Sequence, residues 1–128
     1  SSEPSAVKSE KPHRNLVAWQ KAMELVTEIY QVTDRFPKEE ILGWTSQIRR
    51  AAVSVPSNIA EGADDRTTQQ FTNFLSSAIG SLNEINTQLE LAYRLTYLAK
   101  SSYDNLHRML DECLANTYGL RKSLKTRS

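Results

Sequence analysis

Residue types suited to catalysis or metal binding are scarce in this 128-residue chain, which has two histidines and one cysteine. Neither His13 nor His107 belongs to a cluster of several ligand-type residues, and the inward-facing Glu-x-x-His pairs of di-iron bundles do not occur, since the one such spacing, Glu10 to His13, falls in the N-terminal tail. The sequence also lacks a glycine-rich phosphate loop, a zinc-type cysteine pair and a nucleophile elbow. We therefore expect no enzyme activity, no metal and no cofactor.

The single cysteine, Cys113, cannot form a disulfide within the chain, and it falls at an apolar position of a helical pattern. Free cysteine is among the most buried residue types and behaves as a small apolar side chain. We therefore expect a reduced thiol in the core and not a nucleophile.

A polar stripe in the middle of the chain is the second candidate for chemistry. Arg50, Ser54, Asn58 and Glu61 recur every three or four residues and share one side of a helix. One interpretation is structural: the stripe satisfies the backbone carbonyl that Pro56 leaves without a donor and the loop after the helix, since a kinked helix always leaves such groups. The other is a contact with a ligand or a subunit, and an enzyme that uses Asn58 and Glu61 in a cleft is its least favoured form. We assign a structural role to Ser54, Pro56, Asn58, Glu61 and Gly62.

Basic residues form two groups, and either could bind phosphate. Arg49 and Arg50 are adjacent, whereas Arg121, Lys122 and Lys125 lie near the C-terminus without a nearby acid. On a monomer the second group is explained as a solvated helix end, where cations complement the helix dipole. If a ring repeated these residues around an axis, the summed field would favour nucleic-acid binding.

Four amphipathic patterns must position these residues. Apolar residues recur at helical spacing over 16–33, 41–59, 71–96 and 103–124. Asn15 is the expected cap of the first helix, and Thr67 and Gln70 have the spacing of a capping box before the third. Gly62 is expected to end the second helix in a left-handed conformation.

The second pattern continues past Pro56, so we expect that helix to bend there. Short connections make successive helices neighbours, which predicts an all-α, antiparallel up-down-up-down four-helix bundle. The expected organisation is a flexible tail over 1–14, the bundle over 15–124 and a basic end over 125–128. The third pattern carries additional apolar residues beside its main stripe, more than one partner face requires.

The totals exclude some functions. The formal net charge is +1, so any nucleic-acid role must come from how the basic residues are arranged. No apolar stretch reaches the length of a membrane span, and the first residues lack the apolar stretch of a signal peptide. We therefore expect a cytoplasmic protein with no membrane contact.

Three segments carry a resemblance to a known family: "NLVAWQKAMEL", "FPKEEILGWTSQIRRAAVSVPSNIAEG" and "FLSSAIGSLNEINTQLELAYRLTYL". In this order they resemble the four-helix bundle proteins of intervening sequences in bacterial 23S rRNA genes, over roughly residues 15 to 120 and most specifically from Ser46 to Gly62. The resemblance implies a ring-like homopentamer. It also implies a relationship to the accessory variability determinants of diversity-generating retroelements, which look suited to binding structured RNA and a reverse transcriptase.

Two functional hypotheses remain. The first is a non-enzymatic oligomeric scaffold that binds RNA or an RNA-processing protein through Arg49, Arg50, Arg121, Lys122 and Lys125, repeated by symmetry. The second is a protein-interaction module that binds no nucleic acid, which the nearly neutral charge favours.

Overall fold

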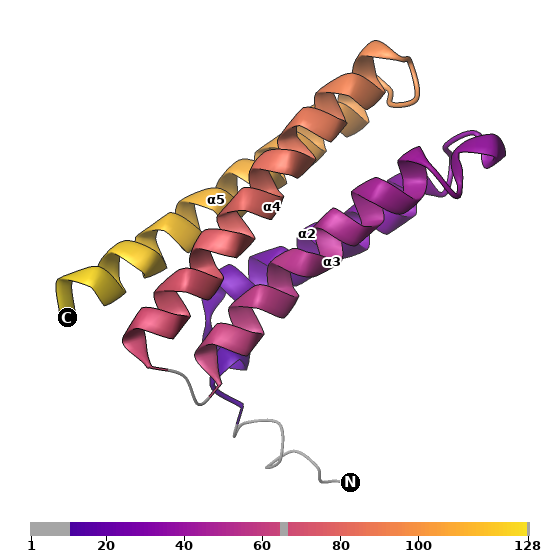
Figure 1. Ribbon diagram of the computed structural model, residues 1–128. Helices are drawn as coiled ribbons and strands as arrows, with labels where there is room; N and C mark the ends of the chain where they lie inside the picture. The colour runs from indigo at the N-terminus through magenta and orange to yellow at the C-terminus, as the bar shows by residue number, and fades with distance from the viewer. Residues whose placement is uncertain (1–10, 65–66, 128) are drawn as a thin grey trace, which may run out of the picture.

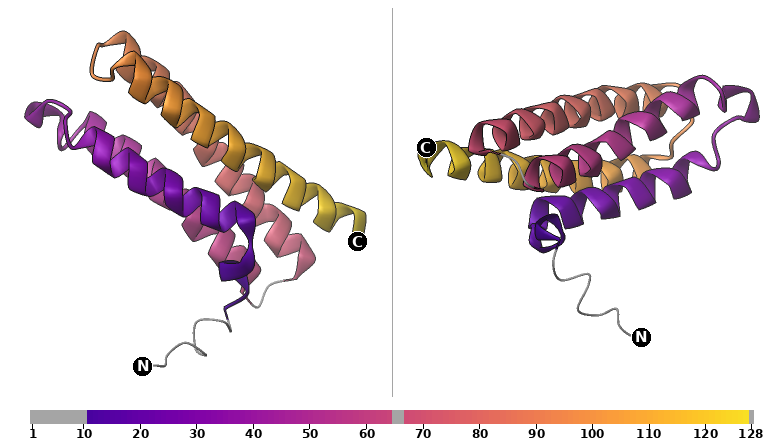
Figure 2. Two further views of the ribbon diagram at one scale, coloured as in Figure 1. Left: turned by 180° about the vertical axis from the view of Figure 1, so that it is seen from behind. Right: turned by 60° about the horizontal axis from the view of Figure 1, so that its bottom comes forward.

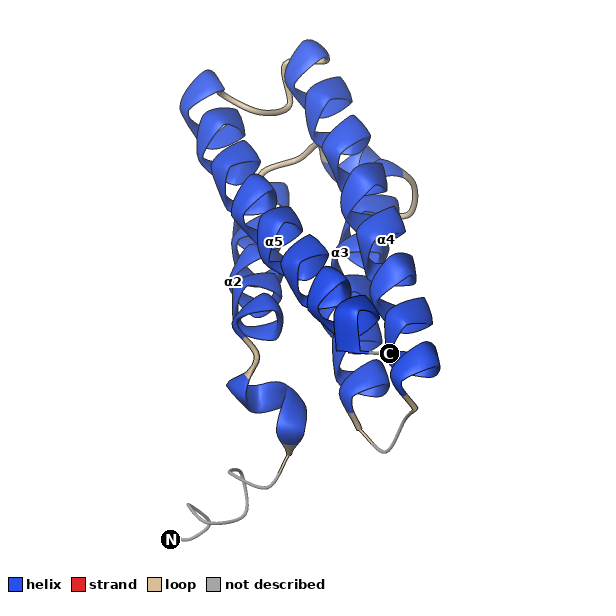
Figure 3. Cartoon of the chain, turned by 90° about the vertical axis from the view of Figure 1, so that its left-hand side faces the viewer, coloured by secondary structure: helices blue, strands red, loops and turns tan. Residues whose placement is uncertain are grey.

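The computed structural model describes residues 11–64 and 67–127, and these form helices and no strand (Figures 1 and 3). The predicted all-α four-helix class is confirmed. The four long helices are α2 (Val17–Thr33), α3 (Trp44–Ala63), α4 (Thr68–Arg94) and α5 (Lys100–Arg127), and two short 3-10 helices are η1 (Pro12–Asn15) and η2 (Lys38–Glu40).

The helices form a closed bundle in which each packs on the next in the chain and α5 packs back on α2. The connections α2–α3 and α4–α5 lie at one end, and the α3–α4 connection lies at the other (Figure 1). Seen from behind, α2 and α5 lie in front of α3 and α4 (Figure 2). We call the end with the connections 34–43 and 95–99 the hairpin end, and the end where α5 finishes the basic end.

Local sequence explains the start of α4. The hydroxyl of Thr67 accepts a hydrogen bond from the backbone N–H of Gln70, whose side chain accepts one from the N–H of Thr67. This confirms the predicted capping box. Helix α3 begins at Trp44, later than its apolar pattern, because η2 and a turn occupy residues 38–43. Asn15 is not the cap of α2; Leu16 takes that position, without a side-chain cap.

The ends of the chain differ from the predicted boundaries. Residues 1–10 of the expected tail lie outside the described residues, but η1 contacts α2 and α3. Its His13 packs at 4.9 Å from the ring of Trp19, and its Nδ1 lies 3.4 Å from the Asp64 carboxylate. At the other terminus α5 continues through Arg127, so residues 125–127 of the predicted basic segment are helical.

The core is a column of apolar side chains drawn from all four helices. Its large, fully buried side chains are Leu25, Ile29, Ile48, Val55, Ile59, Leu75, Leu82, Ile85, Leu89, Leu106 and Leu110. Burying each such side chain contributes roughly 1.5–3 kcal/mol relative to exposure. Thr117 is the polar residue that is fully buried with them. None of the described helices combines the length and apolar character that crossing a bilayer requires.

Candidate partner surfaces

Arg49 and Arg50 are adjacent in sequence but have different surroundings. The Arg49 guanidinium donates to Thr33 Oγ1 at 2.9 Å and to the Tyr30 carbonyl at 3.2 Å, and it lies 4.5 Å from the centre of the Tyr30 ring. It therefore satisfies the last turn of α2 and complements the negative end of that helix. Arg50 is exposed and donates to Ser46 Oγ at 3.0 Å.

The rest of the polar stripe ties α3 to itself and to α4. Ser54 Oγ donates to the Ala51 carbonyl at 2.8 Å and lies 2.5 Å from Ser81 Oγ on α4. Asn58 Nδ2 donates to the Ser54 carbonyl at 2.7 Å. Pro56 has no N–H, so the Ala52 carbonyl loses its helical donor. The two side-chain bonds go to the neighbouring carbonyls of Ala51 and Ser54.

Pro56 itself is buried inside α3, which continues to Ala63. The bend expected at this proline stays a prediction. Glu61 is exposed on the last turn of the same helix. The stripe therefore places Ser54 and Asn58 in the framework of α3 and leaves Glu61 at its outer surface.

Gly62 has a role different from the predicted one. It does not take a left-handed conformation, since no described glycine has a positive φ, and α3 ends one residue later. A Cβ at this position would lie 2.8 Å from Phe71 Cδ1 and 2.8 Å from Phe74 Cβ. Gly62 is thus required by the close approach of α3 to the first turns of α4, a tertiary contact.

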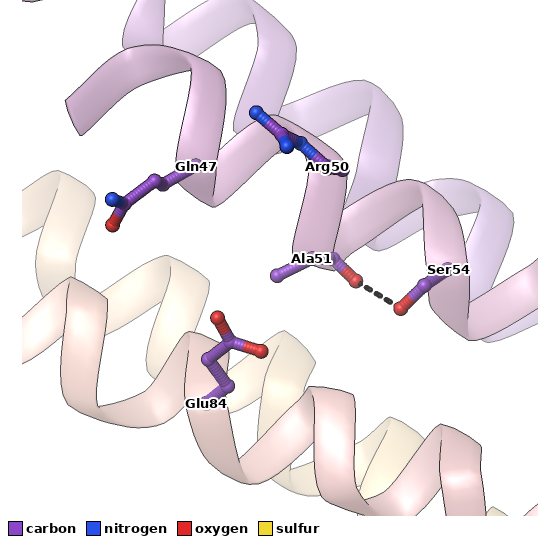
Figure 4. Close-up of a pocket in the computed structure, with 5 residues that line it drawn as sticks. All are labelled: Gln47, Arg50, Ala51, Ser54 and Glu84. Atoms are coloured by element: carbon purple, nitrogen blue, oxygen red, sulfur yellow. Dashed lines mark hydrogen bonds between the residues drawn. The ribbon is translucent and has the colours of Figure 1, made fainter. Parts of the chain in front are cut away.

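Between α3 and α4, toward the hairpin end, lies an open groove of about 450 Å³. Gln47, Arg50, Ala51 and Ser54 line one wall and Glu84 the other, as Figure 4 shows. The carboxylate of Glu84 accepts from the Gln88 amide at 3.4 Å. Among the described residues, two buried polar atoms lack a hydrogen-bond partner, Trp44 Nε1 and Gln88 Oε1, and both belong to this half of the α3–α4 pair.

The C-terminal basic group lies at the opposite end of the bundle. Arg121 donates to Ser76 Oγ on α4 at 3.1 Å, and its guanidinium lies 5.1 Å from the centre of the Tyr118 ring. Lys122 and Lys125 are exposed. The structure therefore brings Arg121 beside α4 but does not bring the C-terminal group to Arg49 and Arg50 within one chain.

Charge is distributed unevenly along the α4–α5 pair. At the hairpin end charges form i,i+4 ion pairs: Arg94–Glu90 at 2.7 Å, Lys100–Asp104 at 2.9 Å and Arg108–Glu112 at 3.0 Å. At the basic end residues 67–83 carry no charge, and residues 113–128 carry basic residues and no acid. The sequence analysis identified the basic residues but missed the uncharged first half of α4. Its significance depends on the antiparallel packing of α4 and α5, which places this half beside the basic residues.

The residue types suited to catalysis do not converge. Cys113 is fully buried near the Ala18 carbonyl, and burial raises the pKa of its thiol to about 11. His107 lies 3.3 Å from Asp111 on the surface of α5. Within residues 11–64 and 67–127, no group of three or more His, Cys, Asp or Glu side chains could hold a metal ion.

Comparison with known proteins agrees with this architecture. The bundle is similar to the crystal structure of a protein of unknown function from the S23 ribosomal protein family of Bacteroides thetaiotaomicron, with a TM-score of 0.77 and 24% sequence identity, covering 83% of this chain and 96% of that one. A comparison with curated proteins gave no match. The family model for 23S rRNA-intervening sequence proteins matches residues 14–119, which include all of α2, α3 and α4 and most of α5. The chain therefore belongs to the 23S rRNA-intervening sequence protein family.

Proposed function

We propose that this protein is a non-enzymatic homo-oligomeric scaffold, a ring and most simply a pentamer, that binds structured RNA. The RNA contacts the basic end, where α5 presents Arg121, Lys122 and Lys125 beside the uncharged first half of α4. Arg50 adds a cation on α3, whereas the donors of Arg49 are engaged by α2.

The observation that carries the proposal is the segregation of charge. Polyanions are attracted by cations whose field nearby acids do not cancel. Toward the hairpin end Arg94, Lys100 and Arg108 each have a carboxylate oxygen within 3.0 Å. At the basic end α4 and α5 contribute no acidic residue over 67–83 and 113–128. The described acids beside this surface belong to the end of α3: Glu61, exposed on its last turn, and Asp64, whose carboxylate lies 3.4 Å from His13 Nδ1.

The first half of α4 also suits a phosphate backbone. On the side of α4 that lies beside Arg121, the exposed residues are Gln69, Ser76 and Asn83, whose hydroxyl and amide groups donate hydrogen bonds to phosphate and sugar oxygens. Arg121 is already oriented by Ser76 and Tyr118, so less side-chain entropy is lost when it binds phosphate. A ring would place several copies of this surface on one side and add their fields.

Charge reversal at the two ends tests the RNA contact. We expect Lys122→Glu with Lys125→Glu to weaken binding of a structured RNA about tenfold or more and to reduce the salt slope of the affinity by about two. The matched control is Lys38→Glu with Lys100→Glu, the same charge change at the hairpin end. Equal loss in both variants would show only a net-charge effect, and unchanged affinity in both would contradict RNA binding at the basic end.

The oligomeric part is tested separately by light scattering of the purified protein, with and without RNA, at low and moderate salt. We expect a pentamer mass that increases with RNA at low salt, because screening weakens phosphate contacts. A monomer would contradict the scaffold. A pentamer that gains no RNA would leave the scaffold and move the partner to a protein.

A second candidate function has its own observation. The hairpin end exposes Ile41, Leu42 and Leu95 by 58%, 92% and 53%, which is unusual for a surface that meets only water. This favours a protein-interaction module, with an RNA-processing protein such as a reverse transcriptase as one such partner. A complex that survives nuclease treatment and is lost in Leu42→Asp, but not in Lys122→Glu, would support it.

A further inference from the structure

The outward face of α4 is unusual for a helix that meets only solvent. One row of exposed positions recurs every three or four residues along the helix, and only Glu84 in it is charged: Asn73, Ser77, Gly80, Glu84, Thr87 and Leu91. Glu90 and Arg94, which lie beside Leu91, form an ion pair with each other. Exposed helix faces normally carry many charged residues. The face ends in Leu91 and Leu95. Both belong to the additional apolar residues that the sequence carries beside the main stripe of this helix, and both are exposed, whereas Ile79 and Leu98 of the same set are buried.

Gly80 lies in the middle of this face. A Cβ there would have no atom within 4 Å, so packing within the chain gives no reason for a residue that is unfavourable in a helix. The absence of a side chain leaves the backbone of α4 accessible to a close neighbour.

A second unpartnered surface lies on the other side of α3. A groove of about 430 Å³ runs between the end of α2 and the first half of α3. Tyr30, Ile41 and Val53 give it exposed apolar walls, and Arg49 and Arg50 are its charged residues. No acid lines it.

The two surfaces complement each other in charge. Arg49 is engaged by α2, and Arg50 forms no ion pair with any described residue. Glu84 is the one charge in this row of α4, and among the described residues it too has no cationic partner within ion-pair distance, whereas Glu90 and Arg94 pair with each other. A concave apolar surface with an unpaired cation thus exists beside a convex, weakly charged surface with an unpaired anion.

We propose that the outward face of α4 in one copy packs into the α2–α3 groove of the next copy, with Glu84 beside Arg50 and Leu91 against the apolar walls. This rests on the homo-oligomer in the proposed function and names the surfaces that form it. The contact is heterologous, because different surfaces of two identical chains meet. The surfaces flank α3 on adjacent sides of one bundle, so each copy is rotated relative to the last, and a rotation that closes after a whole number of copies gives the ring of the proposed function.

An interaction within one chain must be separated from this contact. Arg50 and Glu84 of the same chain line opposite walls of the α3–α4 groove (Figure 4). A variant that reverses both charges in one chain would restore either kind of pair. Mixing two single variants restores only a pair formed between chains.

The experiment therefore uses Arg50→Glu and Glu84→Arg as separate proteins. We expect each alone to raise the concentration needed for assembly at least roughly tenfold, because like charges then meet in the contact. An equimolar mixture should regain mass in light scattering, and native mass spectrometry should find both variants in one particle. A ring with an odd number of copies keeps one mismatched contact, so recovery should be large but incomplete.

Two controls make the result decisive. Glu24→Arg changes an exposed acid of α2 outside both surfaces and should leave assembly unchanged. Leu91→Asp should weaken assembly without loss of helical circular dichroism, because Leu91 is outside the core.

The outcomes separate the two proposals. If the wild-type protein assembles but the mixture regains nothing, this contact is wrong and the scaffold stands. If the wild-type protein is a monomer at all concentrations, the scaffold itself fails, and this contact fails with it.

Discussion

Helices α3 and α4 meet differently at the two ends of the bundle. At the basic end Gly62 lets the backbone of α3 approach Phe71 and Phe74 so closely that no side chain fits between them. Toward the hairpin end the same two helices enclose an open groove, and Trp44 Nε1 and Gln88 Oε1 remain buried without partners in the described structure. One helix pair is thus closely packed at one end and incompletely packed at the other.

The difference separates a contact that stabilises the fold from a surface that is available for association. Close packing fixes α3 against α4, and an unsatisfied buried polar atom costs about 1–3 kcal/mol. Exposed large apolar residues concentrate at the incompletely packed end, with Ile41, Leu42, Leu91 and Leu95 as its main examples. We therefore expect substitutions at Gly62 to affect mainly folding, and substitutions on the exposed hairpin-end surfaces to affect mainly association.

The largest effect should come from Gly62→Ala. The added methyl group would lie 2.8 Å from Phe71 and Phe74, so α3 and α4 must separate or the rings must move. Overpacking of this kind typically costs 1–3 kcal/mol, and we expect about 2–3 kcal/mol less stability in urea unfolding.

Gly80→Ala is the matched control for this comparison, since its methyl group meets open space. We expect about 0.5–1 kcal/mol more stability in the monomer. If Gly62→Ala were equally harmless, the contrast between the two ends would be wrong.

Arg49→Met should have the next largest effect. The variant loses the hydrogen bonds to Thr33 and to the Tyr30 carbonyl while keeping an apolar side chain of similar length. Because hydrogen bonds to charged groups contribute more than neutral ones, we expect a loss of about 2 kcal/mol in chemical denaturation. Arg50→Met, whose described bond is to exposed Ser46, should change stability by less than about 0.5 kcal/mol. Equal losses would remove the distinction between the two arginines.

Thr96→Gly tests the hairpin end with the opposite sign. Thr96 has a φ of 65°, a left-handed conformation that is unfavourable for a β-branched residue. We expect glycine to raise the free energy of unfolding by about 1 kcal/mol, the strain relieved being partly offset by the entropy of glycine in the unfolded chain. A lower thermal midpoint would mean that the Thr96 side chain contributes more than its conformation costs.

The smallest effect concerns the neighbouring Tyr97 and depends on pH. Its hydroxyl donates to Glu40 at 2.9 Å, and this hydrogen bond, with burial and the charges of Glu40 and Glu39, raises the pKa of Tyr97 above 10.0. A raised folded pKa means that this stabilisation is complete below pH 10.0 and is lost as the pH rises through the folded value.

Tyr97→Phe keeps the ring contact with Phe36 and removes the hydroxyl. The difference in urea midpoint between wild type and Tyr97→Phe should therefore be constant near neutral pH and shrink above pH 10.0. A difference that is independent of pH into this range would contradict the assigned hydrogen bond.

Local chemistry made most of the fold predictable. The capping box at Thr67 and Gln70 depends on residues three apart, and the four apolar patterns depend on helical period, so both are contained in short stretches of sequence. The burial of Cys113 followed from its place in such a pattern. The resemblance of the block from Ser46 to Gly62 identified the family, which the match over residues 14–119 confirms.

Tertiary contacts explain what the sequence did not reveal. A glycine after an apolar pattern usually ends a helix, but Gly62 is explained by two phenylalanines of the next helix. Arg49 and Arg50 are the same residue type on one helix, and only the position of α2 engages the first and leaves the second exposed. The roles of Arg121, Lys122 and Lys125 depend on partners outside one chain and stay predictions.

An even number of helices returns the chain to the end where it began. The start of α2 and the end of α5 lie at the basic end, whereas the α2–α3 and α4–α5 connections lie at the other (Figure 1). The bundle therefore has a fixed polarity, with the outermost described segments both at one pole. Any domain fused at either side of the bundle would crowd that pole, whereas an insertion in the turn at residues 95–99 would project from the opposite one.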